Sequence, residues 1–317
     1  MEFVQPTLEQ MQYGLRAMKA VALADGELDD AERAMLAAVQ EVGGSSYDID
    51  ALGPITPAEL AEHIVDPQLR WQLTGALVIM SCIDEKVVDS EAVAVARFAA
   101  AMEVEERAIH NLRQLADEHT VLARFDVIRR FWAVDRIRER MAKEGRFKIL
   151  RSTLNAALGR GEDPEMAARY QALGQLPPGT LGRAYYDSMR DNQFPLPGET
   201  GSAPETITYH DMTHVLSGYG TTPEEEVLVA CFSAGFRRKE PLAFVLFVLM
   251  QFHLGLRIAL GVQPEHGKFD VRGALLALRR GAAMNIDLST GWEYWDVVEE
   301  PLDELRRRYD IAPRVGH

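Results

Sequence analysis

Two histidines and an aspartate in the second half of the chain have the residue types and the spacing of metal ligands. They are His210, Asp211 and His214, in the segment ITYHDMTHVLSGYG. In a helix each residue turns by about 100°, so the two imidazoles lie about 40° apart, one turn above the other. Asp211 lies about 60° beyond His214 on the same face. The spacing therefore predicts three nitrogen and oxygen donors on one side of a helix.

Glu226 is the carboxylate that can complete such a site. The Gly-rich turn SGYG (217–220) can end the first helix and reverse the chain. Thr222 then begins a new helix as its N-cap, with Pro223 at the first helical position and Glu225 in a capping box. Glu226 lies one position beyond this box, and an antiparallel return of the helix brings it beside the two histidines. Two imidazoles with two carboxylates suit zinc, iron, cobalt or manganese.

The complete pattern, H-D-x-x-H-x₁₁-E, is more specific than its parts. A pair of histidines four residues apart is common in helices that bind no metal, and Asp is too short to match the general base of an HExxH protease. A further carboxylate at a fixed distance makes a metal site the favoured interpretation. We expect the ligands to be His210, Asp211, His214 and Glu226.

These positions resemble the metal motif of the ubiquinone (coenzyme Q) biosynthesis family called Coq-four. Two further segments resemble the same family, namely LPPGTLGRAYYDSM at 176–189 and the C-terminal segment at 279–311. The similarity covers about residues 125–317. It implies an all-helical, dimeric protein with a hydrophobic cavity for a prenylated aromatic substrate, and contact with a biosynthetic complex at the inner membrane surface.

The resemblance also implies a reaction, the oxidative removal of a ring carboxylate from a quinone precursor. A divalent metal with open positions suits that lyase-like chemistry, and an unligated carboxylate can move a proton. The expected catalytic residues are then the same as the expected ligands of zinc, cobalt, iron or manganese: His210, Asp211, His214 and Glu226. Two other functions stay open. One is a non-catalytic prenyl-lipid-binding scaffold with a structural metal, and the other is a paralogue that modifies a small aromatic in specialised metabolism.

An internal repeat places two acidic turns in the first part of the chain. The segments ADGELDDAE and IDEKVVDSE align at an offset of 59 residues, which pairs Asp25 with Asp84 and Glu32 with Glu91. In one interpretation the acidic residues begin the following helices, with Asp29 and Glu32 as a capping box. In the other, the two turns converge and hold a divalent cation through carboxylate oxygens.

The duplicated turns and their Ala- and Val-rich flanking segments resemble the tellurite-resistance TerB-like fold. This second resemblance covers about residues 8–118. The second copy departs from the pattern, because Glu85 replaces the Gly. TerB-like modules imply metal-linked stress or membrane-associated systems, and the resemblance implies no reaction.

Helical periodicity extends through nearly all of the chain, which predicts an all-α protein. We expect two helical domains joined by an Arg-rich amphipathic helix: a TerB-like domain at 1–119, the connecting helix at 120–150, and a metal-binding bundle with a hydrophobic cavity at 151–317. The nearly continuous apolar stretch at 241–261 has three interpretations, namely a buried helix, the lining of a prenyl tunnel, or a membrane span. Gln251, His253 and Arg257 interrupt the stretch and argue against a span.

Composition and charge restrict the partners and the compartment. The 317 residues carry a formal net charge of −14, which disfavours nucleic acid as a partner. Cys82 and Cys231 lie far apart without a metal-binding spacing, which is typical of buried thiols in a reducing compartment. The first residues lack the pattern of a secretory signal. We therefore expect a cytoplasmic protein, with peripheral contact to the inner membrane as the resemblance implies.

Overall fold

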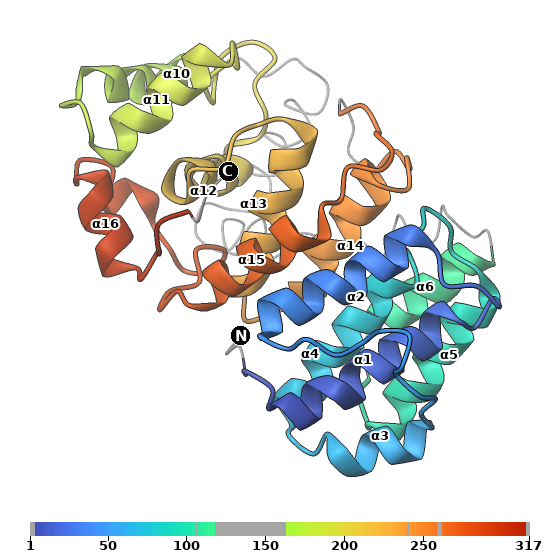
Figure 1. The fold of residues 1–317 in the computed structure, drawn as a ribbon. Helices are drawn as coiled ribbons and strands as arrows, with labels where there is room; N and C mark the ends of the chain where they lie inside the picture. Colours follow the sequence, from blue (N-terminus) through green and yellow to red (C-terminus); the bar gives the residue numbers. More distant parts are fainter. Residues whose placement is uncertain (1–3, 106, 118–162, 240, 259–261, 315–317) are drawn as a thin grey trace. The chain divides into compact units, whose positions relative to one another are not determined.

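The described part of the chain is helical. The computed structural model describes residues 4–105, 107–117, 163–239, 241–258 and 262–314 (Figure 1). Within these ranges it contains α-helices, short 3-10 turns and two isolated β-bridges, and no strand. The all-α prediction is confirmed for these residues. The expected connecting helix at 120–150 lies outside them.

The helices belong to two compact units, each of which is described here by itself. The helices of the first unit are α1 (Leu8–Ala22), α2 (Asp30–Gly43), α3 (Pro57–His63), α4 (Pro67–Met80), α5 (Asp89–Ala101), α6 (Arg107–Ala116), α13 (Pro223–Phe236), α14 (Pro241–Phe252) and α15 (Val271–Ala282). The elements of the second unit are α10 (Pro164–Gln171), η1 (Ala172–Gln175), α11 (Leu181–Asp191), η2 (Glu205–Ile207), α12 (Thr208–Ser217), η3 (Tyr294–Asp296) and α16 (Leu302–Arg308). The expected boundaries at 119 and 150 fall outside the described residues and stay predictions.

The core of the first unit is centred on α1. This helix contacts α2, α3, α4 and α5 and buries Leu15, Met18 and Val21 completely or nearly so. Helix α15 contacts α2, and Arg272 on α15 makes an ion pair with Glu41 on α2. Burial of a continuous apolar face is the main source of stability for such short helices.

The two acidic turns begin their helices differently. Asp29 is the N-cap of α2 and forms the predicted capping box with Glu32, each side chain accepting a backbone N–H at 2.8 Å. The residue that precedes α5 is Val88, and no side chain caps this helix. The capping interpretation therefore explains Glu32 but leaves its counterpart Glu91 without that role.

Helix α14 is the first part of the apolar stretch expected at 241–261. It is buried on nearly every side, which confirms the buried-helix interpretation for its residues. The helix is shorter than the sequence predicts, because Leu254 bridges to His266 and Gly255 adopts a left-handed φ of 67°. His253 is a core residue whose Nε2 donates to the carbonyl of Ile83 at 2.9 Å. Among the described helices, none has the length and apolar character needed to cross a bilayer.

Two glycines let α13 and α15 approach closely. A Cβ atom added to Gly235 on α13 would lie 2.2 Å from the carbonyl oxygen of Leu278, and one added to Gly281 on α15 would lie 1.9 Å from that of Phe232. Neither position has room for a side chain, so the backbones of α13 and α15 are in direct contact where the helices cross. The crossing fixes the helix that carries Glu226 within the first unit.

Candidate metal centre

Helix α12 carries the two predicted histidine ligands. It begins after the 3-10 turn η2 and ends at Gly218, which adopts a left-handed φ of 75°. Glycine reaches this conformation without a steric penalty, so the predicted break at SGYG is confirmed. Tyr209, Met212 and Leu216 bury the opposite part of the helix surface. This burial fixes the rotation of α12 and with it the direction of both imidazoles.

The imidazoles of His210 and His214 face each other through their Nε2 atoms, which are 3.2 Å apart. The rings meet edge to face, with centroids separated by 4.7 Å. If both nitrogens bound one ion at the usual distance of about 2.05 Å, the angle at the ion would be about 100°. That angle lies between the tetrahedral and octahedral values, so the separation of the two nitrogens is compatible with a shared ion.

The turn after α12 fixes the proton of His214. Its Nδ1 lies 2.8 Å from the carbonyl oxygen of Gly220 and 3.2 Å from that of Tyr219. Carbonyl oxygens only accept hydrogen bonds, so Nδ1 carries the proton and donates it. In the neutral ring the lone pair is then on Nε2, the atom that faces His210. Backbone carbonyls commonly orient metal-binding histidines in this way.

Helix α16 holds the C-terminal end of α12 in place. The guanidinium of Arg306 donates hydrogen bonds at 3.0 Å to the carbonyl oxygens of both Leu216 and Val215. Arg314 donates to the carbonyl of Gly218 at 3.2 Å. These contacts satisfy carbonyls that have no partner within the helix. The sequence does not reveal this role, because Arg306 is 90 residues away from Leu216.

Glu226 follows in the first turn of α13. The predicted start of this helix is confirmed, since Pro223 is its first residue and Thr222 Oγ1 accepts the N–H of Glu225 at 3.4 Å. One ligand atom each of His210, His214 and Glu226 lie within 4.8 Å of one another, and the three form a group that can hold a metal ion.

Asp211, the remaining predicted ligand, is not a member of this group. It lies near the buried hydroxyl of Tyr185 on α11, where burial and then the negative charge of Asp211 raise the tyrosine's pKa above its ordinary value. The assignment of Asp211 as a metal ligand stays a prediction. As a carboxylate next to His210 in the chain, it is also suited to accept a proton.

A pair of buried tyrosines adjoins this part of α12. The hydroxyls of Tyr170 and Tyr294 are 2.7 Å apart, and Tyr170 also donates to Glu205 at 3.0 Å. Burial, the nearby Tyr294 and the charge of Glu205 raise the pKa of Tyr170. The sequence analysis did not identify these hydroxyls, because the tyrosines are 124 residues apart and belong to no motif.

Two imidazoles and one carboxylate form a donor set of known chemistry. Structural zinc sites normally have four protein ligands, whereas catalytic zinc sites have three and leave a position for water or substrate. The same donors bind non-haem iron in oxygenases. Bound to one ion, His210, His214 and Glu226 would supply the donor types of these sites.

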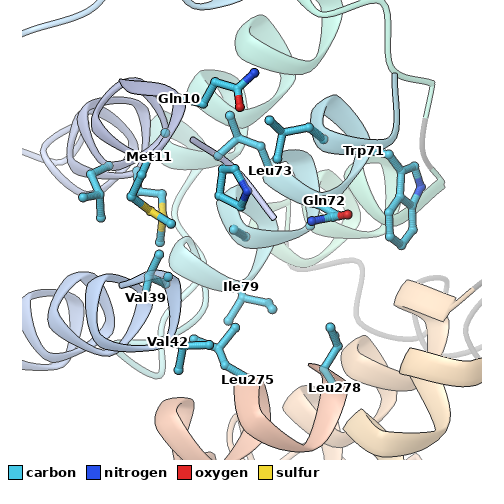
Figure 2. Close-up of a pocket in the computed structure, with 18 of the residues that line it drawn as sticks. Gln10, Met11, Val39, Val42, Trp71, Gln72, Leu73, Ile79, Leu275 and Leu278 are labelled. Carbon is cyan, nitrogen blue, oxygen red and sulfur yellow. The ribbon is translucent and has the colours of Figure 1, made fainter. Parts of the chain in front are cut away.

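An apolar cavity of about 160 Å³ lies within the first unit. Figure 2 shows side chains from several helices around it, among them Met11, Val39, Ile79 and Leu275. Leu242, from the stretch expected to line a prenyl tunnel, contributes to the lining. The cavity expected in the metal-binding bundle itself stays a prediction.

No family model matches the sequence of this chain, and no curated protein matches it. The resemblances to the Coq-four family and to the TerB-like fold therefore rest on the motifs in the sequence. They remain hypotheses about function.

Proposed function

We propose that this protein is a metal-dependent enzyme that acts on a hydrophobic aromatic molecule related to quinone precursors. The observation that carries the proposal is the group His210, His214 and Glu226, which offers two imidazoles and one carboxylate to a single ion. The protonation of His214 supports it, because the lone pair of this ring is directed toward the other histidine. Asp211 would be a fourth ligand or a proton acceptor beside them.

The proposed reaction is the oxidative loss of a ring carboxylate. The carboxylate leaves as carbon dioxide, water supplies the hydroxyl that takes its place, and dioxygen accepts the two electrons and two protons and leaves as hydrogen peroxide. A bound divalent metal such as zinc, cobalt, iron or manganese supplies Lewis acidity toward the carboxylate and a neighbouring phenolate. The chain's own residues hold the ion, and Asp211 accepts the phenol proton. A homodimer and contact with the inner membrane surface, both implied by the Coq-four resemblance, belong to the same proposal.

A second candidate function is the paralogue that modifies a small aromatic in specialised metabolism. The apolar cavity of about 160 Å³ does not decide between the two functions, because its lining residues belong to the first unit and include neither histidine. The assay of substrates with and without a polyprenyl tail distinguishes them.

The experiment is elemental analysis of protein purified without added metal, combined with an activity assay. The assay measures carbon dioxide release from a hydroxybenzoate and from its polyprenyl derivative. We expect about one transition-metal ion per chain, and we expect His214→Ala to lose both the ion and the activity. Glu224→Gln is the matched control, since Glu224 lies in the same helical turn as Glu226 but makes an exposed ion pair with Lys268.

The two candidate functions give different outcomes in this assay. Activity on the polyprenyl substrate alone would support the ubiquinone-type enzyme, and activity on the single ring alone would support the paralogue. Full activity of a folded His214→Ala variant would contradict both.

A further inference from the structure

The apolar cavity of the first unit is surrounded by helices that are far apart in the sequence. Side chains of α1, α2, α4 and α15 line it, and α14 contributes Leu242 and Val245 (Figure 2). All of the lining residues belong to the first unit. Several of them are fully or almost fully buried, among them Met18, Met35 and Ile64. The cavity is therefore part of the core of this unit.

The lining is unsuited to a charged or strongly polar ligand. Among the described residues, no charged side chain lines the cavity. Its three glutamines already take part in hydrogen bonds. Gln72 pairs with the backbone N–H and carbonyl of Val4 through both ends of its amide, at 2.7 and 3.0 Å. Gln5 Nε2 donates to a backbone carbonyl at the end of α2 at 3.2 Å, and Gln10 Oε1 accepts the N–H of the N-cap residue of α1 at 2.9 Å.

These glutamines also show where the cavity reaches the surface. Gln5 is exposed, and Gln10 and Gln72 are half-buried. Their hydrogen bonds connect the segment before α1 to α2 and α4. A ligand that enters beside this segment leaves its own polar groups without compensation for the lost contact with water. The chemistry of the lining therefore selects an uncharged, apolar molecule.

The volume of the cavity limits the size of that molecule. The cavity measures about 160 Å³. An engineered cavity of about 150 Å³ with an apolar lining stays free of water and takes up benzene or xenon. An empty space of this kind deprives the lining atoms of dispersion contacts, so an apolar occupant is favoured. One aromatic ring fills the cavity, whereas a polyprenyl tail or a long acyl chain exceeds it.

Three methionines in the lining favour an aromatic ring over an aliphatic group of the same size. They are Met11, Met18 and Met35, from α1 and α2. The thioether sulfur makes favourable contacts with aromatic rings, and the unbranched methionine side chain adapts to the outline of a ligand. Trp71 adds an aromatic side chain to the same lining.

We propose that this cavity is a binding site for one small, uncharged aromatic molecule of the size of benzene or toluene. The ligand is held by burial of apolar surface and by contacts with the methionine sulfurs. The site includes neither His210 nor His214, and it excludes the carboxylate that a hydroxybenzoate carries. It is therefore separate from the proposed metal-dependent reaction and stands if that proposal fails.

Calorimetric titration of the full chain with toluene tests the site. We expect one toluene molecule per chain, which 4-hydroxybenzoate does not displace. Val39→Phe introduces a ring into the cavity from α2 and should weaken the dissociation constant of toluene at least tenfold. Val93→Phe is the matched control, because Val93 is a half-buried valine of α5 outside the lining. It should change the constant less than twofold.

A thermal measurement gives an independent readout. Toluene should raise Tm of the parent protein and of Val93→Phe, because a ligand that binds only the folded state stabilises it. The rise should be absent in Val39→Phe. If Val39→Phe does not fold, Ala76→Leu fills the cavity from α4 and provides the same comparison.

Diffraction from xenon-pressurised crystals of the parent protein locates the site without a variant. Xenon should occupy the space among Met11, Val39 and Leu73, and a cavity without xenon would contradict the proposal. Absence of toluene binding at its saturating concentration would overturn it, as would unchanged binding in a folded Val39→Phe or Ala76→Leu variant. Displacement of toluene by 4-hydroxybenzoate would show that the cavity accepts a charged ligand and would likewise overturn it.

Discussion

The Nε2 atom of His214 faces the Nε2 atom of His210 at 3.2 Å, while its Nδ1 donates to the carbonyl of Gly220. One backbone carbonyl thus determines which nitrogen of His214 is available to an ion. A histidine fixed in this way binds a metal without first losing the freedom of its ring or changing its tautomer. This relationship supports metal binding by α12 through geometry, in addition to the pattern of residues in the sequence.

Replacement of His210 should disrupt the metal centre while leaving the fold intact. We expect His210→Ala to weaken zinc or cobalt binding by about 100-fold or more. Even residues that only hydrogen-bond to a metal ligand contribute about 10- to 100-fold to metal affinity. The half-buried position of His210 predicts a small change in the free energy of unfolding. A competition titration with a chelator measures the affinity. Binding within threefold of the parent would exclude His210 as a ligand.

Arg306 should stabilise the second unit through the end of α12. Arg306→Ala removes the donors to the carbonyls of Leu216 and Val215, and we expect it to lower the free energy of unfolding by about 1–3 kcal/mol. Arg307→Ala is the control, because the side chain of Arg307 is 74% exposed and pairs with Glu304 at the surface. It should change stability by about 0.5 kcal/mol or less. Urea denaturation of both variants checks the difference, and equal effects would exclude this role of Arg306.

Lowering the pH should reduce the stability of the second unit, because Glu199 becomes protonated. Two hydrogen bonds from Arg190, at 2.8 and 2.6 Å, hold the pKa of Glu199 at about 2, below its ordinary value of 4.5. Because the folded-state pKa is lowered, the stabilisation is complete above pH 4.5 and is lost as the pH falls toward 2.

Glu199→Gln tests this pH dependence. We expect a loss of about 2 kcal/mol at pH 7 and a smaller dependence of stability on pH between 5 and 2 than in the parent protein. Asp303→Asn, at an 89% exposed side chain, should leave the parent's dependence unchanged. Denaturant titrations over this pH range measure both. An identical pH profile for Glu199→Gln and the parent would show that the ion pair contributes nothing.

The glycine crossing of α13 and α15 should tolerate no side chain. We expect Gly281→Ala to destabilise the protein by about 3 kcal/mol or more, since its Cβ would lie 1.9 Å from the carbonyl oxygen of Phe232. Gly14→Ala in α1 is the contrasting case, because its Cβ would make an ordinary contact at 3.5 Å with Leu73 beside the apolar cavity. That variant should be about 1 kcal/mol more stable. Thermal unfolding of the two variants distinguishes them, and equal shifts would contradict the close crossing.

Local features of this fold could be predicted from the sequence because neighbouring residues determine them. The stretch expected to be helical at 31–42 corresponds to α2, and the capping box of Asp29 follows from the spacing of two residues. The end of α12 at Gly218 and the start of α13 at Pro223 were predicted for the same reason. The cap, the end and the start each depend on fewer than six consecutive residues, and the helix at 31–42 depends on the apolar periodicity within its own twelve residues.

Features that depend on distant segments could not be predicted. The sequence did not indicate that α13, α14 and α15 belong to the same compact unit as α1–α6. It offered two interpretations of Glu91 but did not indicate that its side chain is buried near that of Glu32 in the other copy of the repeat. It predicted too long a helix at 241–261, because hydrophobicity continues beyond Phe252 while the backbone turns at Gly255.

The central claim is that one ion is bound by two imidazoles and a carboxylate. X-ray absorption spectroscopy of the zinc- or cobalt-loaded protein measures this coordination most directly. The account predicts two imidazole nitrogens at about 2.0–2.1 Å, with the remaining ligands oxygen, and loss of this metal signal in His214→Ala. A spectrum without imidazole scattering, or one that His214→Ala leaves unchanged, would contradict it.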